Sequence, residues 1–375
     1  MNTQTPVSTP HPMRPDSPAV LLALIPHLLG FVPDSSLIVI GTDLAGLVKV
    51  TLRYDLPDPA GAEAAADLCE HVIAVLSSHQ LTMAAAVGYG PGQLVTPLVQ
   101  ALRQAAANAR IELDEVLRVQ DGRYWSYTCT GHPCCPAEGA PIDPAAHPAS
   151  AAIARSQPSA LASRHALAAT IAPLPGTDAD TMPQATRRAE EHIALAHATF
   201  SGRPVKARAA IVQEGLAAVA GMVATYRHGG RYRSADQLAL LTVVLTDLRV
   251  RDDAWARMDP EHAPAHLRLW TDVVRRAQPG YVALAASLLG FVAWQRGNGA
   301  LANVALDRAL ADQPRYSMAE LLRQVITAGA PPSMARLPLT PEQVAQAYAT
   351  GDAEDDADTA EPGSSTEPEP ASATA

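Results

Sequence analysis

Hydrophobic and polar positions follow two different periods along this chain, strand-like in the first part and helical afterwards. Leu37 to Ile40 is a continuous apolar run, and Val48 to Tyr54 alternates apolar and polar residues after a short loop. This pattern predicts a β-hairpin. Two further alternating segments, Glu115 to Val119 and Arg123 to Tyr127, flank Asp121-Gly122, which is typical of a type I′ turn.

Helical segments lie between these strands. Ser17-Pro18 begins a short apolar helix that ends at Gly30, and the spacing of apolar residues predicts helices over 60–77 and 93–109. An apolar strand over 83–89 precedes the last of these helices. The first part of the chain is therefore expected to be an α/β domain, a mixed sheet covered by helices.

From Pro183 onward every periodic segment has helical spacing, which predicts an all-α helical-hairpin domain. The expected helices cover 185–200, 205–226, 234–248, 265–276, 281–295, 300–311, 317–328 and 340–349.

Small residues predict a close helix contact near the C-terminal end of this region. Gly290, Ala302 and Ala309 are spaced as in a tetratricopeptide-like unit, and Gly297 lies in the turn between the two helices. The spacing occurs once, which favours an isolated helical hairpin over a repeat array. We expect Ala302→Leu to be destabilising, and Asp307→Ala, on the opposite flank, to be nearly neutral.

Composition divides the chain into five segments. Residues 1–16 are polar and Pro-rich and predict a disordered arm, while residues 351–375 predict an acidic disordered tail. Between them we expect the α/β domain at 17–150, a boundary segment rich in Pro, Ala, Gly and Ser at 151–182, and the helical domain at 183–350.

Charge argues against a nucleic-acid partner. The whole chain has a net charge of −10. The segment 352–375 holds eight acidic residues and no Lys or Arg, so the rest of the chain has a net charge of −2. A nearly neutral protein has no strong basic surface to attract nucleic acid or anionic lipid, so we expect neither nucleic acid nor a membrane as a partner.

Apolar stretches and cysteines predict a cytoplasmic location. The stretches 19–32 and 283–294 are shorter than the about 18–20 apolar residues that cross a bilayer, and the first has no signal-peptide flanks. Four cysteines are too few to form a disulfide framework in a chain of this length, which suits a reducing compartment.

Six short motifs together resemble the uncharacterised, actinobacterial-type domain-of-unknown-function family 4192, over about residues 19–335. The resemblance implies a shared fold and a bacterial, cytoplasmic origin, and it transfers no catalytic residue. This chain has Asn298 where the family usually has Asp. The motifs are Leu28-Leu29-Gly30-Phe31-x-Pro33, Ser36-Leu37-Ile38-Val39, Arg53-x-Asp55-Leu56-Pro57, Cys134-Cys135-Pro136-x2-Gly139, Trp294-x2-Gly297-x-Gly299-x2-Ala302 and Gly329-x-Pro331-Pro332.

Four clustered side chains are weak candidates for a metal site. Cys129, His132, Cys134 and Cys135 offer the thiolate and imidazole donors that Zn²⁺ prefers. Adjacent cysteines seldom share one ion, however, and no second cysteine pair completes a tetrahedron. We therefore expect no metal here and favour a structural turn, with a redox role as the alternative.

Two other features are candidates for binding or chemistry. Gly88, Gly90 and Gly92 lie between a strand and a helix, where backbone N–H groups can hold a phosphate, although Pro91 removes one donor. Arg53 and Asp55 end a strand before Pro57, where an ion pair is the simpler interpretation.

We therefore expect a cytoplasmic binding or regulatory module that acts through its helical domain, with a protein partner. The alternative is an enzyme whose cleft lies between the two domains and uses Arg53, Asp55 and the Gly88–Gly92 turn. A third interpretation, nucleic-acid binding by the loop 226–233, is disfavoured by the charge balance. No cofactor and no oligomeric state follow from the sequence.

Overall fold

The computed structural model describes residues 17–57, 62–129, 135–143, 148, 160–200, 203–232, 234–334 and 339–358. The chain groups into two compact units, each assembled from separate stretches. Unit 1 contains residues 1–175 and 270–335, and unit 2 contains residues 176–269 and 336–375. The predicted boundary segment at 151–182 stays a prediction. The sequence prediction places residues 183–350 in one helical domain, whereas the structure groups residues 270–335 with the strands.

Unit 1 is built on a six-stranded mixed sheet with the strand order β2-β1-β3-β4-β5-β6. β1 pairs antiparallel with β2 and β3, and β3 pairs parallel with β4. The expected mixed sheet followed by helices is thus confirmed. The strands are β1 Ser36–Thr42, β2 Val48–Asp55, β3 Met83–Tyr89, β4 Glu112–Gln120, β5 Arg123–Ser126 and β6 Ala140–Pro141.

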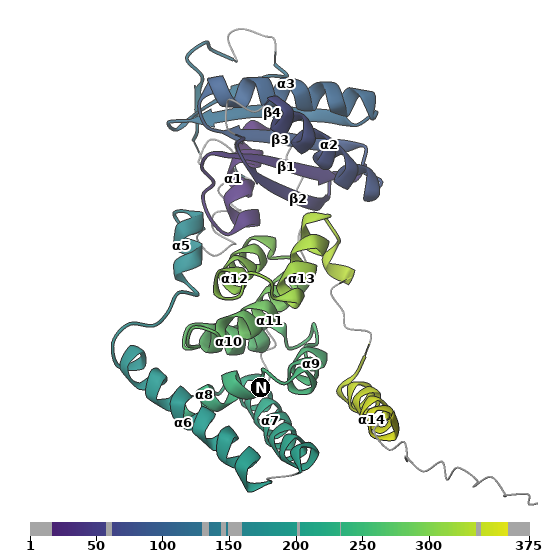
Figure 1. The fold of residues 1–375 in the computed structure, drawn as a ribbon. Helices are drawn as coiled ribbons and strands as arrows, with labels where there is room; N and C mark the ends of the chain where they lie inside the picture. Colours follow the sequence, from purple (N-terminus) through teal and green to yellow (C-terminus); the bar gives the residue numbers. More distant parts are fainter. Residues whose placement is uncertain are drawn as a thin grey trace, which may run out of the picture. The chain divides into compact units, whose positions relative to one another are not determined.

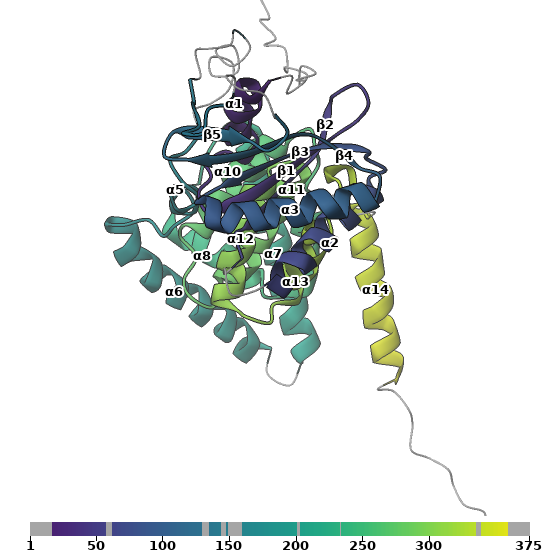
Figure 2. The same ribbon diagram turned by 90° about the horizontal axis from the view of Figure 1, so that it is seen from above.

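Helices cover both faces of this sheet. Figure 2 shows α1 (Pro18–Leu29) on one side and α2 (Ala62–Ser78) and α3 (Gly92–Asn108) on the other. Alternate residues Leu37 and Val39 of β1 pack against α2 and α3 in a buried apolar cluster. Every residue of β1 is buried, which explains why its sequence is continuously apolar.

The turns use the residues that the sequence indicates. The Ser17 side chain accepts the N–H of Val20 at the start of α1, and Gly30 ends that helix with a φ of 78°. Asp121 and Gly122 both have positive φ between β4 and β5, as a type I′ turn requires. β6 was not predicted, because its two residues carry no period.

Three helices of the second half belong to unit 1. They are α11 (Val282–Gln295), α12 (Gly299–Asp312) and α13 (Ser317–Thr327), with the short helices α5 (Arg164–Ala169) and η1 (Pro332–Met334). Figure 1 shows α12 and α13 on the side of the sheet where β2 lies. The Gly329 carbonyl accepts a hydrogen bond from His79 Nε2, at the end of α2.

Unit 2 is helical throughout its described residues. It contains α6 (Thr177–Thr199), α7 (Pro204–Arg227), α8 (Ala235–Val244), α9 (Leu248–Ala256) and α14 (Pro341–Asp358), and α10 (Ala263–Val274) spans the boundary between the units. The single helix predicted over 234–248 is wrong. The helix is interrupted at residues 245–247, between α8 and α9. The Asp247 side chain caps α9 by accepting the N–H of Arg249. α14 extends through Asp358 into the segment predicted to be disordered, and 359–375 lie outside the described residues.

One helix among the described residues, Val205–Arg227, is long and apolar enough to cross a membrane by length and composition. At 23 residues it is longer than the apolar stretches 19–32 and 283–294. Core helices of water-soluble proteins pass the same test, and within unit 2 this helix packs against α6, α8 and α9.

Candidate binding groove

One edge of the sheet in unit 1 is formed by β2, which pairs on one side only. Ser36 pairs with Asp55 and Leu37 with Tyr54, and the Leu56 N–H donates to the Ser35 carbonyl. Because hydrogen-bonded positions alternate in an antiparallel ladder, Tyr54 and Leu52 bond to β1.

The backbone groups of Thr51 and Arg53 therefore point away from β1. Within the described part of the chain, neither N–H has a hydrogen-bond partner. Such unpaired groups form a template on which another extended segment can pair.

A groove of about 560 Å³ runs along this edge. All eight residues of β2 line it, and the opposite wall comes from α12, α13 and the segment that follows α13. The remaining lining is mostly apolar or glycine, with Phe31 and Trp294 as the aromatic members. The lining residues outside β2 are Leu28, Leu29, Phe31, His79, Arg164, Trp294, Gly297, Gly299, Ala300, Asn303, Arg323, Ile326, Thr327, Gly329, Ala330, Pro331 and Pro332.

The charged residues in this lining are predominantly basic. Lys49, Arg53, Arg164 and Arg323 line the groove together with one acid, Asp55. Arg164 and Arg323 both pair with Asp307 of α12, so two guanidinium groups share one carboxylate. Lys49 pairs with Asp43 and Arg53 pairs with Asp55, so the four cations face three carboxylates and one positive charge is left in excess along this wall.

Arg53 is the most enclosed cation of the groove. Its side chain is 18% exposed, and its guanidinium carbon lies 5.9 Å from the centroid of the Phe31 ring. One Nη atom bonds Asp55, but Nε is buried and has no hydrogen-bond partner among the described residues. Buried donors are normally hydrogen-bonded to protein, to ordered water or to a ligand, so Arg53 Nε offers a hydrogen bond at this edge.

Neighbouring groups hold the groove wall in place. The Trp294 Nε1–H donates to the Ala330 carbonyl over 3.1 Å, which ties α11 to the segment after α13. Asn298 caps α12 by accepting the N–H of Leu301. Burial raises the pKa of Tyr54 to about 12, so its phenol is neutral at physiological pH.

The structure brings the sequence-predicted residues Arg53, Asp55 and the glycine turn to the same end of the sheet. Asp55 and Tyr89 both pair with Ser36, and a Cβ on Gly90 would lie 2.8 Å from the Leu56 side chain. Arg53 and Asp55 line the groove, whereas Gly88, Gly90 and Gly92 do not. The expected ion pair between Arg53 and Asp55 is present.

The glycine turn has few free donors. The Gly90 N–H donates to the Val119 carbonyl, and Pro91 has no N–H. Gly88 is required by packing, because a Cβ there would lie 2.3 Å from Val95. The guanidinium of Arg118 lies next to Gly92, at the start of α3, and stacks on Trp125. A phosphate role for Gly88, Gly90 and Gly92 stays a prediction, as does the enzyme interpretation.

The cysteine candidates are only partly described. Cys129 and Cys135 are half-buried, while His132 and Cys134 lie outside the described residues. In the loop 226–233, Tyr226 is fully buried and Arg227 pairs with Asp259. The first two residues of that loop are thus engaged within unit 2.

Most residues of the groove carry no signal in the local sequence. Arg164, Trp294 and Arg323 lie far apart in the chain, on three different helices, and nothing local marks them as neighbours. The available signal was the set of family motifs, since four of the six line this groove: those around Phe31, Arg53, Trp294 and Gly329.

Comparison with known proteins gives one match. The family model described as "Domain of unknown function (DUF4192)" matches residues 18–333. No curated protein matches, and no solved structure matches. Because the matched segment covers most of the 375 residues, the chain belongs to the DUF4192 family.

Proposed function

We propose that this protein is a binding module that takes an extended acidic peptide segment along the free edge of β2. The observation that carries the proposal is the pair of unpartnered N–H groups at Thr51 and Arg53 inside a groove. An extended chain pairs with such an edge through main-chain hydrogen bonds and gains specificity from alternate side chains.

The dimensions of the groove support a peptide. β2 has eight residues, so its edge is about 26 Å long at roughly 3.3 Å per residue, the length of a short peptide segment. Because every one of these residues lines the groove, the whole edge is open to it. Phe31 and Trp294 provide apolar contacts for alternate side chains of the ligand.

The charges support an acidic partner. Lys49, Arg53, Arg164 and Arg323 attract Asp and Glu side chains, and Arg binds carboxylates through two parallel hydrogen bonds. Like charges discourage a second copy of the same strand from pairing with β2. The edge therefore favours a different, negatively charged segment over self-association.

Fluorescence anisotropy with two labelled synthetic peptides tests the proposal. One peptide alternates Val and Glu over the length of β2, and the other alternates Val and Lys. We expect the full-length protein to bind the first and not the second, with an affinity that falls as salt rises. Equal binding of both peptides would contradict the proposal.

Thr51→Pro separates strand pairing from simple charge attraction. Proline removes an N–H that points into the groove, and it takes no hydrogen bond from the β1–β2 ladder. We expect about tenfold weaker binding of the Val/Glu peptide, because one hydrogen bond is lost and the ring obstructs its neighbours. Thr51→Val is the matched control, since it keeps the N–H and the β-branched shape.

A small anion is the competing occupant, and the same variants distinguish it. If citrate or inorganic phosphate raised the melting temperature while Thr51→Pro left the Val/Glu peptide affinity unchanged, the groove would be a small-anion site. That result would overturn strand pairing.

A further inference from the structure

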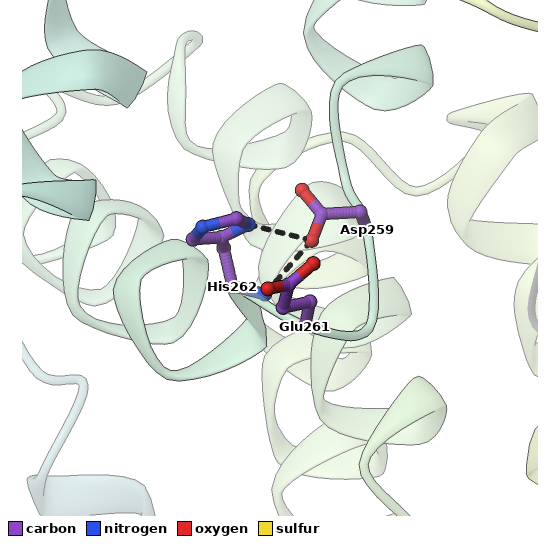
Figure 3. Close-up of side chains that lie close together, drawn as sticks. All are labelled: Asp259, Glu261 and His262. Carbon is purple, nitrogen blue, oxygen red and sulfur yellow. Dashed lines mark hydrogen bonds and ion pairs between the residues drawn. The ribbon is translucent and has the colours of Figure 1, made fainter.

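Unit 2 holds a cluster of metal-ligating side chains at the start of α10. Asp259, Glu261 and His262 each offer one ligand atom, and these atoms lie within 4.8 Å of one another (Figure 3). Asp259 Oδ1 accepts hydrogen bonds from both the backbone N–H and Nδ1 of His262, each over 2.8 Å. The carboxylate thereby fixes the His262 ring beside itself.

A second histidine points to this cluster from one helical turn further on. His266 follows His262 by four residues, and residues with this spacing lie on the same face of a helix. Its Nε2 atom lies 3.8 Å from Asp259 Oδ2. The His266 residue is 1% exposed, and neither ring nitrogen has a hydrogen-bond partner among the described residues.

The unpartnered ring of His266 requires an explanation. Buried polar groups are normally hydrogen-bonded to protein, to ordered water or to an ion. Asp259 Oδ2 is too distant from Nε2 for a hydrogen bond, so the ring faces the carboxylate without bonding to it. Asp259 already accepts hydrogen bonds from His262 and Arg227, so it is the His266 ring that lacks a partner, and a cation beside Asp259 would provide one.

The distances suit a single small ion. Two ligands of one tetrahedral Zn²⁺ lie about 3.3 Å apart, because each is about 2.0 Å from the metal. The separation of 3.8 Å between Asp259 Oδ2 and His266 Nε2 lies near that value. The 2.8 Å contact between Asp259 Oδ1 and His262 Nδ1 is a hydrogen bond, and His262 must give up the Nδ1 proton to solvent before this nitrogen can bind the ion. Glu261 is exposed and its side chain can turn toward the ion.

We propose that Asp259, Glu261, His262 and His266 form a binding site for a divalent transition-metal ion of the Zn²⁺ class. Two imidazole nitrogens and two carboxylates match the donors that Zn²⁺ takes from proteins. Arg227 already places a positive group on Asp259, and it also bonds the Arg257 carbonyl over 2.9 Å. On metal binding, Arg227 releases Asp259 and keeps the bond to that carbonyl.

Isothermal titration of the chelator-treated, full-length protein with Zn²⁺ and with Co²⁺ tests this site. We expect binding of about one equivalent of either ion, and a Co²⁺ visible spectrum without thiolate charge-transfer bands. His262→Ala and His266→Gln should each lower the affinity by about tenfold or more. Arg227→Gln should strengthen binding, because it removes the competing cation.

Matched controls separate this site from other histidines and from the cysteines. His228→Ala removes an exposed histidine at the end of α7, whose ring bonds only the Ala224 carbonyl in the described residues, and should leave the affinity unchanged. Glu261→Gln alters an exposed side chain and serves as a ligand variant if His266→Gln fails to fold. The proposal is wrong if no equivalent binds, if binding survives His262→Ala and Glu261→Gln, or if Cys129→Ser with Cys135→Ser abolishes it.

Discussion

Ala302 lies at the closest approach of α11 and α12. It is fully buried, and a Cβ on Gly290 would lie 3.1 Å from Leu306 and 3.4 Å from the Ala302 carbonyl. Gly290 and Ala302 therefore lie at the contact between these helices, and Ala309, the third predicted residue, is fully buried. At this scale the sequence was informative, because residue size alone determines how near two helices can approach.

Ala302→Leu is expected to destabilise the protein by about 1–3 kcal/mol, since the added atoms must separate two packed helices. Ala311→Leu is the matched control, because it makes the same substitution at an exposed position of α12. Denaturant unfolding of the two variants gives both free energies. Equal costs would show that the faces of α12 are assigned incorrectly.

Asp307, where sequence periodicity predicts a nearly neutral substitution, pairs with two cations in the structure. Its carboxylate forms ion pairs with Arg164 of α5 and Arg323 of α13. The sequence around Asp307 does not indicate that these two helices lie next to it. Asp307→Ala is expected to cost about 1 kcal/mol, and less at high salt, because the pairs are partly exposed. Unfolding at low and high salt measures this difference, and a cost independent of salt would exclude the ion pairs as its source.

Cys69 should react slowly with thiol reagents. Burial raises the pKa of its thiol, which reduces the thiolate fraction, and the side chain is enclosed between α2 and α3. Cys129 and Cys135 are half-buried and should alkylate first. Mass spectrometry of the protein after timed iodoacetamide treatment locates the label, and early modification of Cys69 would contradict the packing of α2 on the sheet.

At the scale of elements, Gly329 joins the end of α13 to α2. Its φ is 75°, and a Cβ there would lie 2.3 Å from Val75 Cγ1. Its carbonyl also accepts the hydrogen bond of His79. This contact holds the wall of the groove beside the sheet.

Gly329→Ala should therefore destabilise the protein more than a glycine substitution elsewhere. A left-handed backbone alone costs an alanine about 1–2 kcal/mol, and the clash with Val75 adds to it. Gly122→Ala isolates the backbone cost, because Gly122 has a φ of 71° and nothing within 4 Å of an added Cβ. In thermal unfolding, the melting temperature of Gly329→Ala should be lower than that of Gly122→Ala. The reverse order would show that Gly329 does not contact α2.

Elements with a clear period were predictable, and their partners in space were not. The hairpins, α1 and the small-residue contact of α11 with α12 follow from local patterns. The break between α8 and α9 was missed because apolar residues continue across it, and only the Asp247 cap marks the new helix. The groove was not predictable, because Arg164, Trp294 and Arg323 become neighbours only when α11–α13 fold against the sheet region.

At the scale of the whole molecule, each compact unit carries its own proposed site. Unit 1 carries the free edge of β2, and unit 2 carries the cluster of Asp259, Glu261, His262 and His266. Both units are assembled from separate stretches of the chain, so truncation at a linear boundary removes part of a unit. Experiments on either site therefore require the full chain.

Amide hydrogen exchange of β2, resolved by residue, tests strand pairing most directly. In the free protein the N–H groups of Thr51 and Arg53 should exchange rapidly, while those of Leu52 and Tyr54 are protected by their bonds to β1. Adding the Val/Glu peptide should slow exchange at Thr51 and Arg53 and leave Leu52 and Tyr54 nearly unchanged. If the peptide binds without protecting Thr51 and Arg53, the free edge of β2 is not where this protein takes its partner.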